Sequence, residues 1–162
     1  MTTRLPVFRL LVAAAVAVAL GALVLQIERR SSPGGGVVLA DPVRTPGVLN
    51  PEVTQATILA TICRHGWTAT VRPPVEYTNA LKRDQMRAYG EIGPPSAYQE
   101  DHLISLELGG DPTDPRNLWP EPYPRAAAVD QIENQLNGEV CSGSLSLHDA
   151  QEQESALKHS HG

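Results

Sequence analysis

The sequence predicts an α+β domain whose centre is a short strand, a tight loop, a second strand and a helix, with further helices flanking this unit. Three observations support this fold class. Apolar alternation leads into Asp101-His102, the pair Gly109-Gly110 marks a tight excursion, and Asn117 precedes a second apolar step. A helical pattern of apolar residues then begins at Arg125. An additional apolar helix is predicted at the N-terminus.

The N-terminal helix is predicted from an uncharged apolar run between Leu10 and Ile27, with arginines on both sides. At 1.5 Å per residue this run would span about 27 Å, close to the thickness of a bilayer core. Residues 1–30 are therefore interpreted as an uncleaved signal-anchor or, alternatively, as a cleaved signal peptide. Either interpretation implies export, with the domain secreted or anchored to the membrane outside the cytoplasm.

Residues 31–47 are predicted to form a flexible linker, because they are rich in Gly, Ser and Pro and lack periodicity. The folded domain is predicted over residues 48–157. It would start with a helix, since Asn50-Pro51 resembles an N-cap followed by a first helical residue and Gly66 is a plausible stop. The residues at helical spacing in this segment are Val53, Ile58, Leu59 and Ile62.

Alternation over Trp67–Val71 predicts a short strand, ended by two prolines. Thr78 can cap a following helix that extends to about Ala88. The exposed face of this helix is predicted to carry the basic residues Lys82, Arg83 and Arg87. These could contact phosphates, or they could form an ordinary solvated helix face.

The link between the two central strands is rich in Asp-Pro turns and is predicted to be irregular and mostly exposed to solvent. The helix that begins at Arg125 is predicted to end before Gly143. Ser146 and Asp149 have the spacing of a capping box, which predicts a last helix to about Leu157. Residues 158–162 are predicted to be a disordered tail.

Cys63 and Cys141 are the only cysteines, and an even pair in an exported chain is interpreted first as a disulfide. Such a bond would close a large loop around the Asp-His-Asn region and link an early helix to a late one. It would stabilise the fold by about 4–5 kcal/mol in the chain-entropy model.

The residues Asp101, His102 and Asn117 have the chemistry that hydrolysis of a phosphodiester needs. Histidine has an ordinary pKa near neutrality, so His102 is a candidate general base. A hard divalent cation prefers carboxylate and amide oxygens, so Asp101 and Asn117 are candidate ligands for Mg²⁺ or another divalent metal ion. Neighbours on a strand point to opposite faces, so the pair can serve one site only where the strand ends or twists.

The segment from Tyr98 to Cys141, with its Glu100-Asp101-His102 sequence, Leu-Gly-Gly turn, Asn117-Leu118 and following helix, resembles the HNH, or ββα-metal, endonuclease superfamily. The resemblance implies a ββα-metal-like unit in an exported member of bacterial type. It also implies that His102 is the general base, that Asp101 binds the metal ion, and that Asn117 ligates the metal or fixes the histidine.

This superfamily usually carries a third His or Asn early in the helix, where this chain has Arg125-Ala126-Ala127-Ala128. The carboxylates that could substitute are Glu121, Asp130 and Glu133.

The net charge argues against indiscriminate binding of nucleic acid. After Ala40 the chain has nine Lys or Arg and seventeen Asp or Glu, a formal balance of −8 that repels polyanions at long range. Three functions stay open, of which the simplest is a purely disulfide-stabilised extracellular domain that needs no metal; the other two are more specific. The first is an exported metal-dependent nuclease, with DNA only weakly favoured over RNA as its substrate. The alternative is a non-catalytic, disulfide-stabilised cell-surface interaction module on the same fold, with protein partners that the sequence does not identify.

Overall fold

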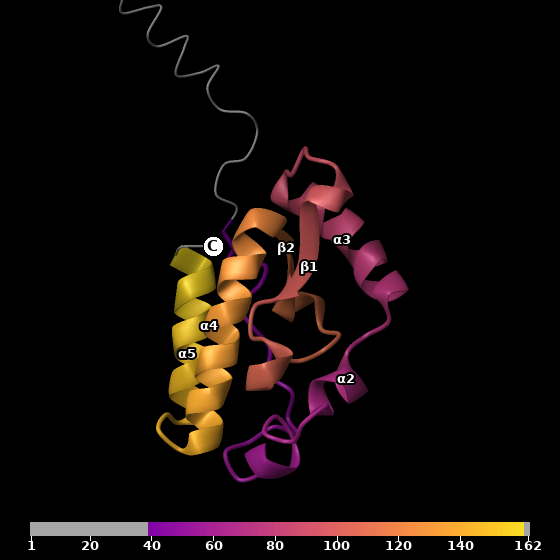
Figure 1. The fold of residues 1–162 in the computed structure, drawn as a ribbon. Coiled ribbons are helices and arrows are strands. Elements are labelled where there is room, and N and C mark those ends of the chain that lie inside the picture. The colour runs from indigo at the N-terminus through magenta and orange to yellow at the C-terminus, as the bar shows by residue number, and fades with distance from the viewer. Residues whose placement is uncertain (1–38, 161–162) are drawn as a thin grey trace, which may run out of the picture. The chain divides into compact units, whose positions relative to one another are not determined.

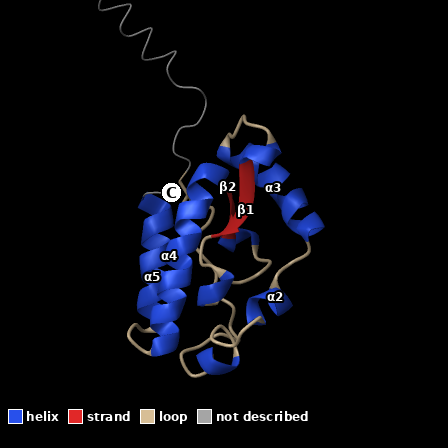
Figure 2. Cartoon of the chain, viewed as in Figure 1, coloured by secondary structure: helices blue, strands red, loops and turns tan. Residues whose placement is uncertain are grey.

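The computed structural model describes residues 39–160, which form an α+β domain with a two-stranded antiparallel sheet at its centre (Figures 1 and 2). The sheet lies between α3 (Val75–Tyr89) and α4 (Tyr123–Ser142), and α5 (Leu147–Ser160) packs along α4. The predicted signal-anchor or signal peptide lies outside the described residues. No helix within residues 39–160 has the length and apolar character needed to cross a membrane.

The central strands are β1 (Tyr98–His102) and β2 (Leu118–Pro122), which confirms the two strands predicted around the Asp-His pair and after Asn117. Their antiparallel register places Asp101 opposite Trp119 and His102 opposite Leu118. Asp101 and His102 therefore occupy the last two positions of β1, where the chain leaves the sheet. The predicted helix after the second strand is confirmed as α4, which gives the chain order strand, strand, helix.

The start and end signals of the last two helices act as predicted. Gly143 has φ +79° and forms the C-cap of α4, a backbone conformation that glycine adopts without a steric penalty. The Asp149 amide donates to Ser146 Oγ at 3.1 Å, and Ser146 Oγ donates to Asp149 Oδ2 at 2.7 Å. The capping box therefore opens α5 at Leu147.

The helix predicted from Asn50 to Gly66 is wrong. Apart from the 3₁₀ turn η1 (Ile58–Ala60), this segment consists of turns and bends. Short polar side chains bond to the local backbone instead, because Asn50 Oδ1 accepts from the Glu52 amide at 3.0 Å and Thr57 Oγ1 donates to the Glu52 carbonyl at 2.8 Å. Such bonds compete with the helical ladder and favour turns.

The strand predicted at Trp67–Val71 is also wrong, because these residues form the short helix α2. Gly66 precedes it with φ +79°, and Thr70 Oγ1 donates to the Trp67 carbonyl at 2.6 Å. Neither β1 nor β2 pairs with this segment, so the alternating residues have no neighbouring strand to which they could form a sheet. The next helix, α3, starts at Val75 and not at Thr78, which lies inside its first turn.

Both ends of the domain are longer than predicted. Residues 39–47, part of the predicted linker, pack against the domain, since Ala40 is 1% exposed and Thr45 is 0% exposed. Residues 158–160 belong to α5 and not to a disordered tail, and Lys158 is completely buried. The two ends contact each other, because the Ala40 amide donates to the Lys158 carbonyl at 3.3 Å.

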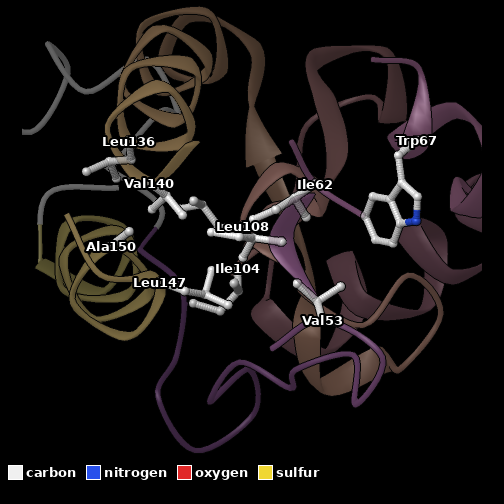
Figure 3. Packing of buried hydrophobic residues seen from close by; sticks show 10 residues of the cluster. Val53, Ile62, Trp67, Ile104, Leu108, Leu136, Val140, Leu147 and Ala150 are labelled. Atoms are coloured by element: carbon white, nitrogen blue, oxygen red, sulfur yellow. The ribbon is translucent and has the colours of Figure 1, made fainter. Parts of the chain in front are cut away.

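The main hydrophobic core lies where the excursion between the strands meets α4 and α5 (Figure 3). Ile104 and Leu108 come from this excursion and lie between Val140 of α4 and Val53 of the N-terminal turns. The first half of the excursion is therefore core, and the prediction of a mostly solvent-facing link holds only for the residues after Gly110. This packing fixes the segment that directly follows Asp101 and His102.

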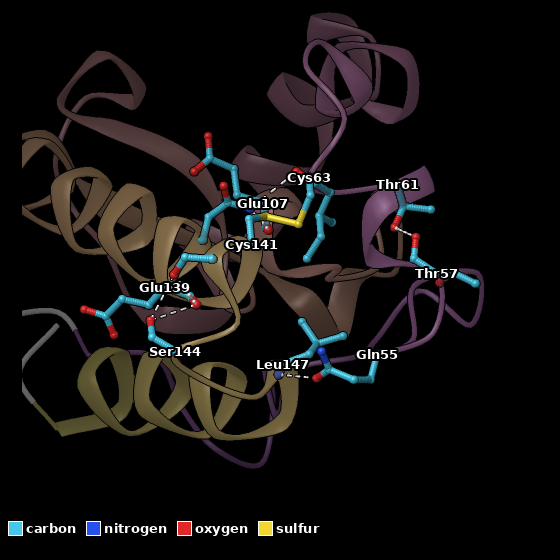
Figure 4. Close-up of a disulfide and its surroundings, with 12 residues drawn as sticks. Gln55, Thr57, Thr61, Cys63, Glu107, Glu139, Cys141, Ser144 and Leu147 are labelled. Carbon is cyan, nitrogen blue, oxygen red and sulfur yellow. Dashed lines mark hydrogen bonds between the residues drawn. A yellow bond between two sulfur atoms is a disulfide. The ribbon is translucent and has the colours of Figure 1, made fainter.

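The predicted disulfide between Cys63 and Cys141 is present, and its Cα atoms lie 5.5 Å apart (Figure 4). It joins the turns after η1, not a helix, to the end of α4. Close by, the Leu147 amide donates to Gln55 Oε1 at 2.7 Å, which ties the same N-terminal segment to the start of α5 (Figure 4). A segment without regular hydrogen-bonded structure is thus held at two points.

We expect the disulfide to carry a large part of the stability. The cysteines are 78 positions apart, and closing a loop of this length lowers the entropy of the unfolded chain by an amount worth about 4–5 kcal/mol. Replacing both cysteines by serine in the full-length protein should reduce the free energy of unfolding by about this amount, measured by urea titration. Wild type in dithiothreitol should match the variant. An unchanged midpoint in both samples would contradict the assignment.

Candidate functional site

A pocket of about 290 Å³ opens beside the end of β1, between the end of α2 and α4. Most of its lining is charged, and Asp101 and His102 both contribute to it. The other ionisable residues of the lining are Arg72, Glu100, Glu107, Asp130 and Glu133. The end of β1 thus brings neighbours of opposite strand faces to one pocket, as the predicted site required.

His102 is buried, with 6% of its surface exposed, yet it faces this polar pocket. Its Nε2 lies 3.1 Å from the Pro112 carbonyl oxygen. Burial lowers the pKa of His102, although the Asp101 charge acts in the opposite direction, so the ring is neutral at neutral pH. A neutral ring can satisfy a carbonyl only by donating from Nε2, which leaves the lone pair on Nδ1. His102 therefore has the tautomer that a general base needs.

Asp101 contacts a residue of α5, Lys158. Its Oδ2 accepts from Lys158 Nζ at 2.9 Å. Burial acts to raise the pKa of Asp101, but the Lys158 ammonium holds that pKa below its ordinary value, so the carboxyl is ionised. Lys158 itself is fully buried, and the surrounding carboxylates outweigh its burial and keep its pKa well above the ordinary value.

Glu121, on β2, is the second carboxyl group beside Asp101. It is 0% exposed, and neither of its oxygens receives a hydrogen bond from an N–H or O–H group. Burial and the charge of Asp101 raise the pKa of Glu121 to about 8. Glu121 is therefore protonated at neutral pH, and its carboxyl proton can be donated to the neighbouring Asp101, which helps to lower the Asp101 pKa.

The side chain of Asn117 makes hydrogen bonds to the backbone and does not line the pocket. Its Oδ1 accepts from the Ile104 amide at 3.0 Å, and its Nδ2 donates to the carbonyls of Ile104 and Asp111, each at 3.0 Å. All three of its hydrogen bonds run to the backbone, and none runs to His102. By holding the excursion closed, Asn117 places the Pro112 carbonyl against His102.

Gly110 makes this closure possible. A Cβ atom there would lie 1.8 Å from the Ile104 carbonyl oxygen and 2.6 Å from Asn117 Nδ2. Any other residue would push apart the groups that Asn117 joins. The Gly109-Gly110 pair was predicted to mark a tight excursion. Glycine is needed at position 110 because the backbone of Ile104 passes too close for a side chain.

The basic residues of α3 do not form one exposed face, as the sequence predicted, because Lys82 is buried. Lys82 is 8% exposed, and its Nζ donates to the Tyr98 carbonyl at 2.9 Å, so it is a buried lysine that supports β1. Arg87 is exposed and forms an ion pair with Asp84. Arg83 is exposed on α3 but does not line the pocket beside β1. The cation that does line it is Arg72, which follows α2.

The donor set of the pocket fits a hard cation. Both oxygens of Glu100 and Oε2 of Glu107 are buried and receive no hydrogen bond. Burial raises the pKa of Glu100 to about 8, against the opposing effect of Lys82, and it also raises the pKa of Glu107, against the opposing effect of Arg72. A divalent ion would add positive charge beside both groups. Within residues 39–160, however, no three His, Cys, Asp or Glu side chains are already arranged around a common metal position.

The sequence did not predict the role of Lys158, because the residue was assigned to a disordered tail. A usable signal was present. Leu147, Gln151, Glu154 and Lys158 recur at helical spacing, and all four are buried. The spacing predicts one inward face, although three of its residues are polar.

Comparison of the chain with protein-family models, curated proteins and solved structures finds no match.

We expect the Glu121→Gln variant to change how stability depends on pH. Glu121 takes up a proton on folding between its ordinary pKa near 4.5 and its native pKa of about 8. The wild-type free energy of unfolding should therefore fall over this range, by at most about 1.4 kcal/mol per pH unit from this group. Glutamine keeps a donor for Asp101 but cannot ionise, so the variant should lose less stability as the pH rises.

Urea unfolding of the full-length protein at pH 5, 6, 7 and 8 measures this difference. The matched control is Glu152→Gln, which changes an exposed glutamate of α5 and should keep the wild-type pH dependence. Parallel curves for wild type and Glu121→Gln would contradict protonation of Glu121 in the folded state.

Proposed function

We propose that this protein is an exported, metal-dependent phosphodiester hydrolase of the HNH, or ββα-metal, type. The observation that carries the proposal is the state of His102: a neutral ring whose Nε2 is bonded to the Pro112 carbonyl and which lines a polar pocket next to Asp101. The order β1, excursion, β2 and α4 agrees with the ββα unit that the sequence resembles.

In this mechanism His102 Nδ1 accepts a proton from a water molecule, and the water oxygen attacks phosphorus. The Pro112 carbonyl holds the ring in the required tautomer and stabilises the imidazolium that forms. The negative charge of Asp101, next in sequence, also favours the protonated ring. The bond from phosphorus to the leaving oxygen then breaks, and solvent can protonate that oxygen.

Asp101, with the unpaired carboxyl group of Glu100 beside it, would hold Mg²⁺ or another divalent ion at the pocket. When bound, such an ion neutralises charge on the phosphate and on the leaving oxygen. One or two carboxylates are enough, since Mg²⁺ commonly keeps several waters and completes its coordination with substrate phosphate. Asn117 is not included as a ligand, because its amide group is bonded to the backbone.

Arg72 is the residue we propose for binding the substrate phosphate. It is exposed and lines the same pocket as His102, so its guanidinium can bind the phosphate group that the water activated by His102 would attack. The proposed substrate is nucleic acid, with DNA weakly favoured over RNA. Export and attachment through residues 1–30 remain part of the proposal, and the Cys63–Cys141 disulfide supports an oxidising location.

One observation favours the alternative, a non-catalytic interaction module on the cell surface. Asp101 is bonded to the ammonium group of Lys158, so its charge is already balanced within the protein. A domain of this kind would need the network only for stability. Activity measurements on His102 variants separate the two functions, because only the hydrolase requires the imidazole.

We expect His102→Ala to reduce cleavage of plasmid and single-stranded DNA by at least about 100-fold, because a general base contributes factors of this size. The full-length protein is incubated with each substrate and with Mg²⁺ or Mn²⁺, and chelator should abolish the wild-type activity. His148→Ala, at an exposed histidine of α5, is the matched control and should keep full activity. Equal, chelator-insensitive background cleavage by all three proteins would remove the hydrolase proposal.

The pH dependence of the reaction should show a low-pH limb below the ordinary pKa of histidine. A base works when it is deprotonated, and burial lowers the pKa of His102, so the active form persists to a lower pH than a solvent-exposed histidine would allow. Initial rates of DNA cleavage at saturating Mg²⁺ between pH 4.5 and 8 measure this limb. A midpoint above 6.5 would contradict the assigned environment of the base.

A further inference from the structure

Lys158 lies where four oxygen atoms converge beneath the pocket. Its Nζ donates to the His102 carbonyl at 2.5 Å, to Glu133 Oε1 at 2.6 Å and to Asp101 Oδ2 at 2.9 Å. A fourth oxygen, Glu154 Oε1, lies 3.3 Å away. All three protons of the ammonium group are therefore used, and none of them faces solvent because the side chain is 0% exposed.

These oxygens come from three separate parts of the fold. Asp101 and His102 end β1, Glu133 lies in the middle of α4, and Glu154 precedes Lys158 by one turn of α5. Hard metal ions are bound by carboxylate and carbonyl oxygens of this kind, although the described side chains, as they stand around Lys158, do not form a metal-binding group. Here the ammonium group of a lysine occupies the point where these oxygens converge.

We infer that Lys158 is a positioning residue that takes the place of a structural metal ion: its ammonium group gathers Asp101, Glu133 and the His102 carbonyl and so fixes the end of β1. The base and the carboxylate of the site are then in place before any divalent ion or substrate arrives. This role does not require that the protein hydrolyse phosphodiesters, because it concerns only how the end of β1 is held.

One consequence is that removing the ammonium group should leave a buried set of oxygens suited to a divalent ion. A second is that Asp101 Oδ2 is occupied in the wild type, so an ion serving catalysis must bind from the pocket side of Asp101. Wild type and a variant without the ammonium group should therefore differ in the number of divalent ions that they bind.

The test is Lys158→Met in the full-length protein, since methionine is unbranched and of similar length but carries no charge. Lys82→Met is the matched control, because Lys82 is also buried but bonds to a single carbonyl, that of Tyr98. Binding of Mn²⁺ is followed at pH 8 by the loss of the free-ion signal in electron paramagnetic resonance. Unfolding is measured in chelator and in millimolar Mn²⁺.

We expect Lys158→Met to be less stable than wild type in chelator, to regain stability in Mn²⁺, and to bind one more Mn²⁺ per molecule than wild type or Lys82→Met. The affinity of Lys158→Met for this additional Mn²⁺ should be at least about tenfold higher than any affinity of the wild type for an ion at the same position, because the repelling charge of the ammonium group has been removed. Equal Mn²⁺ stoichiometry together with equal responses of stability to Mn²⁺ would overturn the inference.

If Lys158→Met does not fold in either condition, the double variant Lys158→Met, Glu154→Gln replaces it. The glutamine keeps an acceptor for the Ser105 amide, which bonds to Glu154 at 3.0 Å, and removes one buried carboxyl group. This variant should fold and bind the additional Mn²⁺ through Asp101 and Glu133; failure to bind it would overturn the inference. Absence of hydrolysis by wild type would refute the proposed function alone and leave the Lys158 result unaffected.

Discussion

The chain leaves the sheet after His102 and returns at Leu118, and the amide side chain of Asn117 holds these two points together. Its three hydrogen bonds run to the backbone of the excursion itself, at Ile104 and Asp111. Because the excursion is closed in this way, Ile104 and Leu108 reach the core while the Pro112 carbonyl reaches His102. Core packing and the orientation of His102 thus depend on one side chain, which explains why Gly110 must leave room for it.

The second constraint is electrostatic. Several carboxyl groups lie close together at the end of β1, and they cannot all be ionised where water is excluded. Lys158 contacts Asp101, which is ionised, whereas burial raises the pKa of Glu121 to about 8 and that of Glu133 to about 9. Burial also raises the pKa of Glu154, the third carboxyl group beside Lys158. Lys158 is thus the one cation within hydrogen-bonding distance of these carboxyl groups among residues 39–160.

The sequence predicted the elements whose signals are local and consistent. The Ser146 capping box, the Gly143 stop and the alternation into Asp101-His102 each correspond to an observed boundary. The predictions for the segments before α3 were wrong. Trp67–Val71 has the alternating pattern of a strand but forms a helix, and the Asn50 side chain accepts a hydrogen bond within a local turn. Local patterns do not reveal whether a partner strand exists, and they do not decide between a helix and a set of turns closed by side chains.

The sequence predicted only those residues of the candidate site that lie close together along the chain. Asp101, His102 and Asn117 are recognisable as a set, and the structure places the first two at one pocket. Lys158 and Arg72 lie far from them in sequence and reach the site only through packing of α5 and of the end of α2. Lys82 was predicted to be exposed with its basic neighbours, but its side chain points inward and donates a hydrogen bond to the Tyr98 carbonyl.

The acidic character of the domain determines what a hydrolase at this site would require. Repulsion from distant carboxylates is screened beyond about 8–10 Å, so the groups of the pocket decide whether a phosphate can enter. Lys158 lies outside the pocket lining and is bonded to Asp101, so Arg72 is the cation of the lining that opposes Glu107 and Asp130. One guanidinium cannot neutralise a phosphodiester and two carboxylates together. Phosphate would therefore enter this pocket with a divalent cation, and the proposed ligands Asp101 and Glu100 would share that ion with the substrate, with the unpaired Oε2 of Glu107 close to the same pocket.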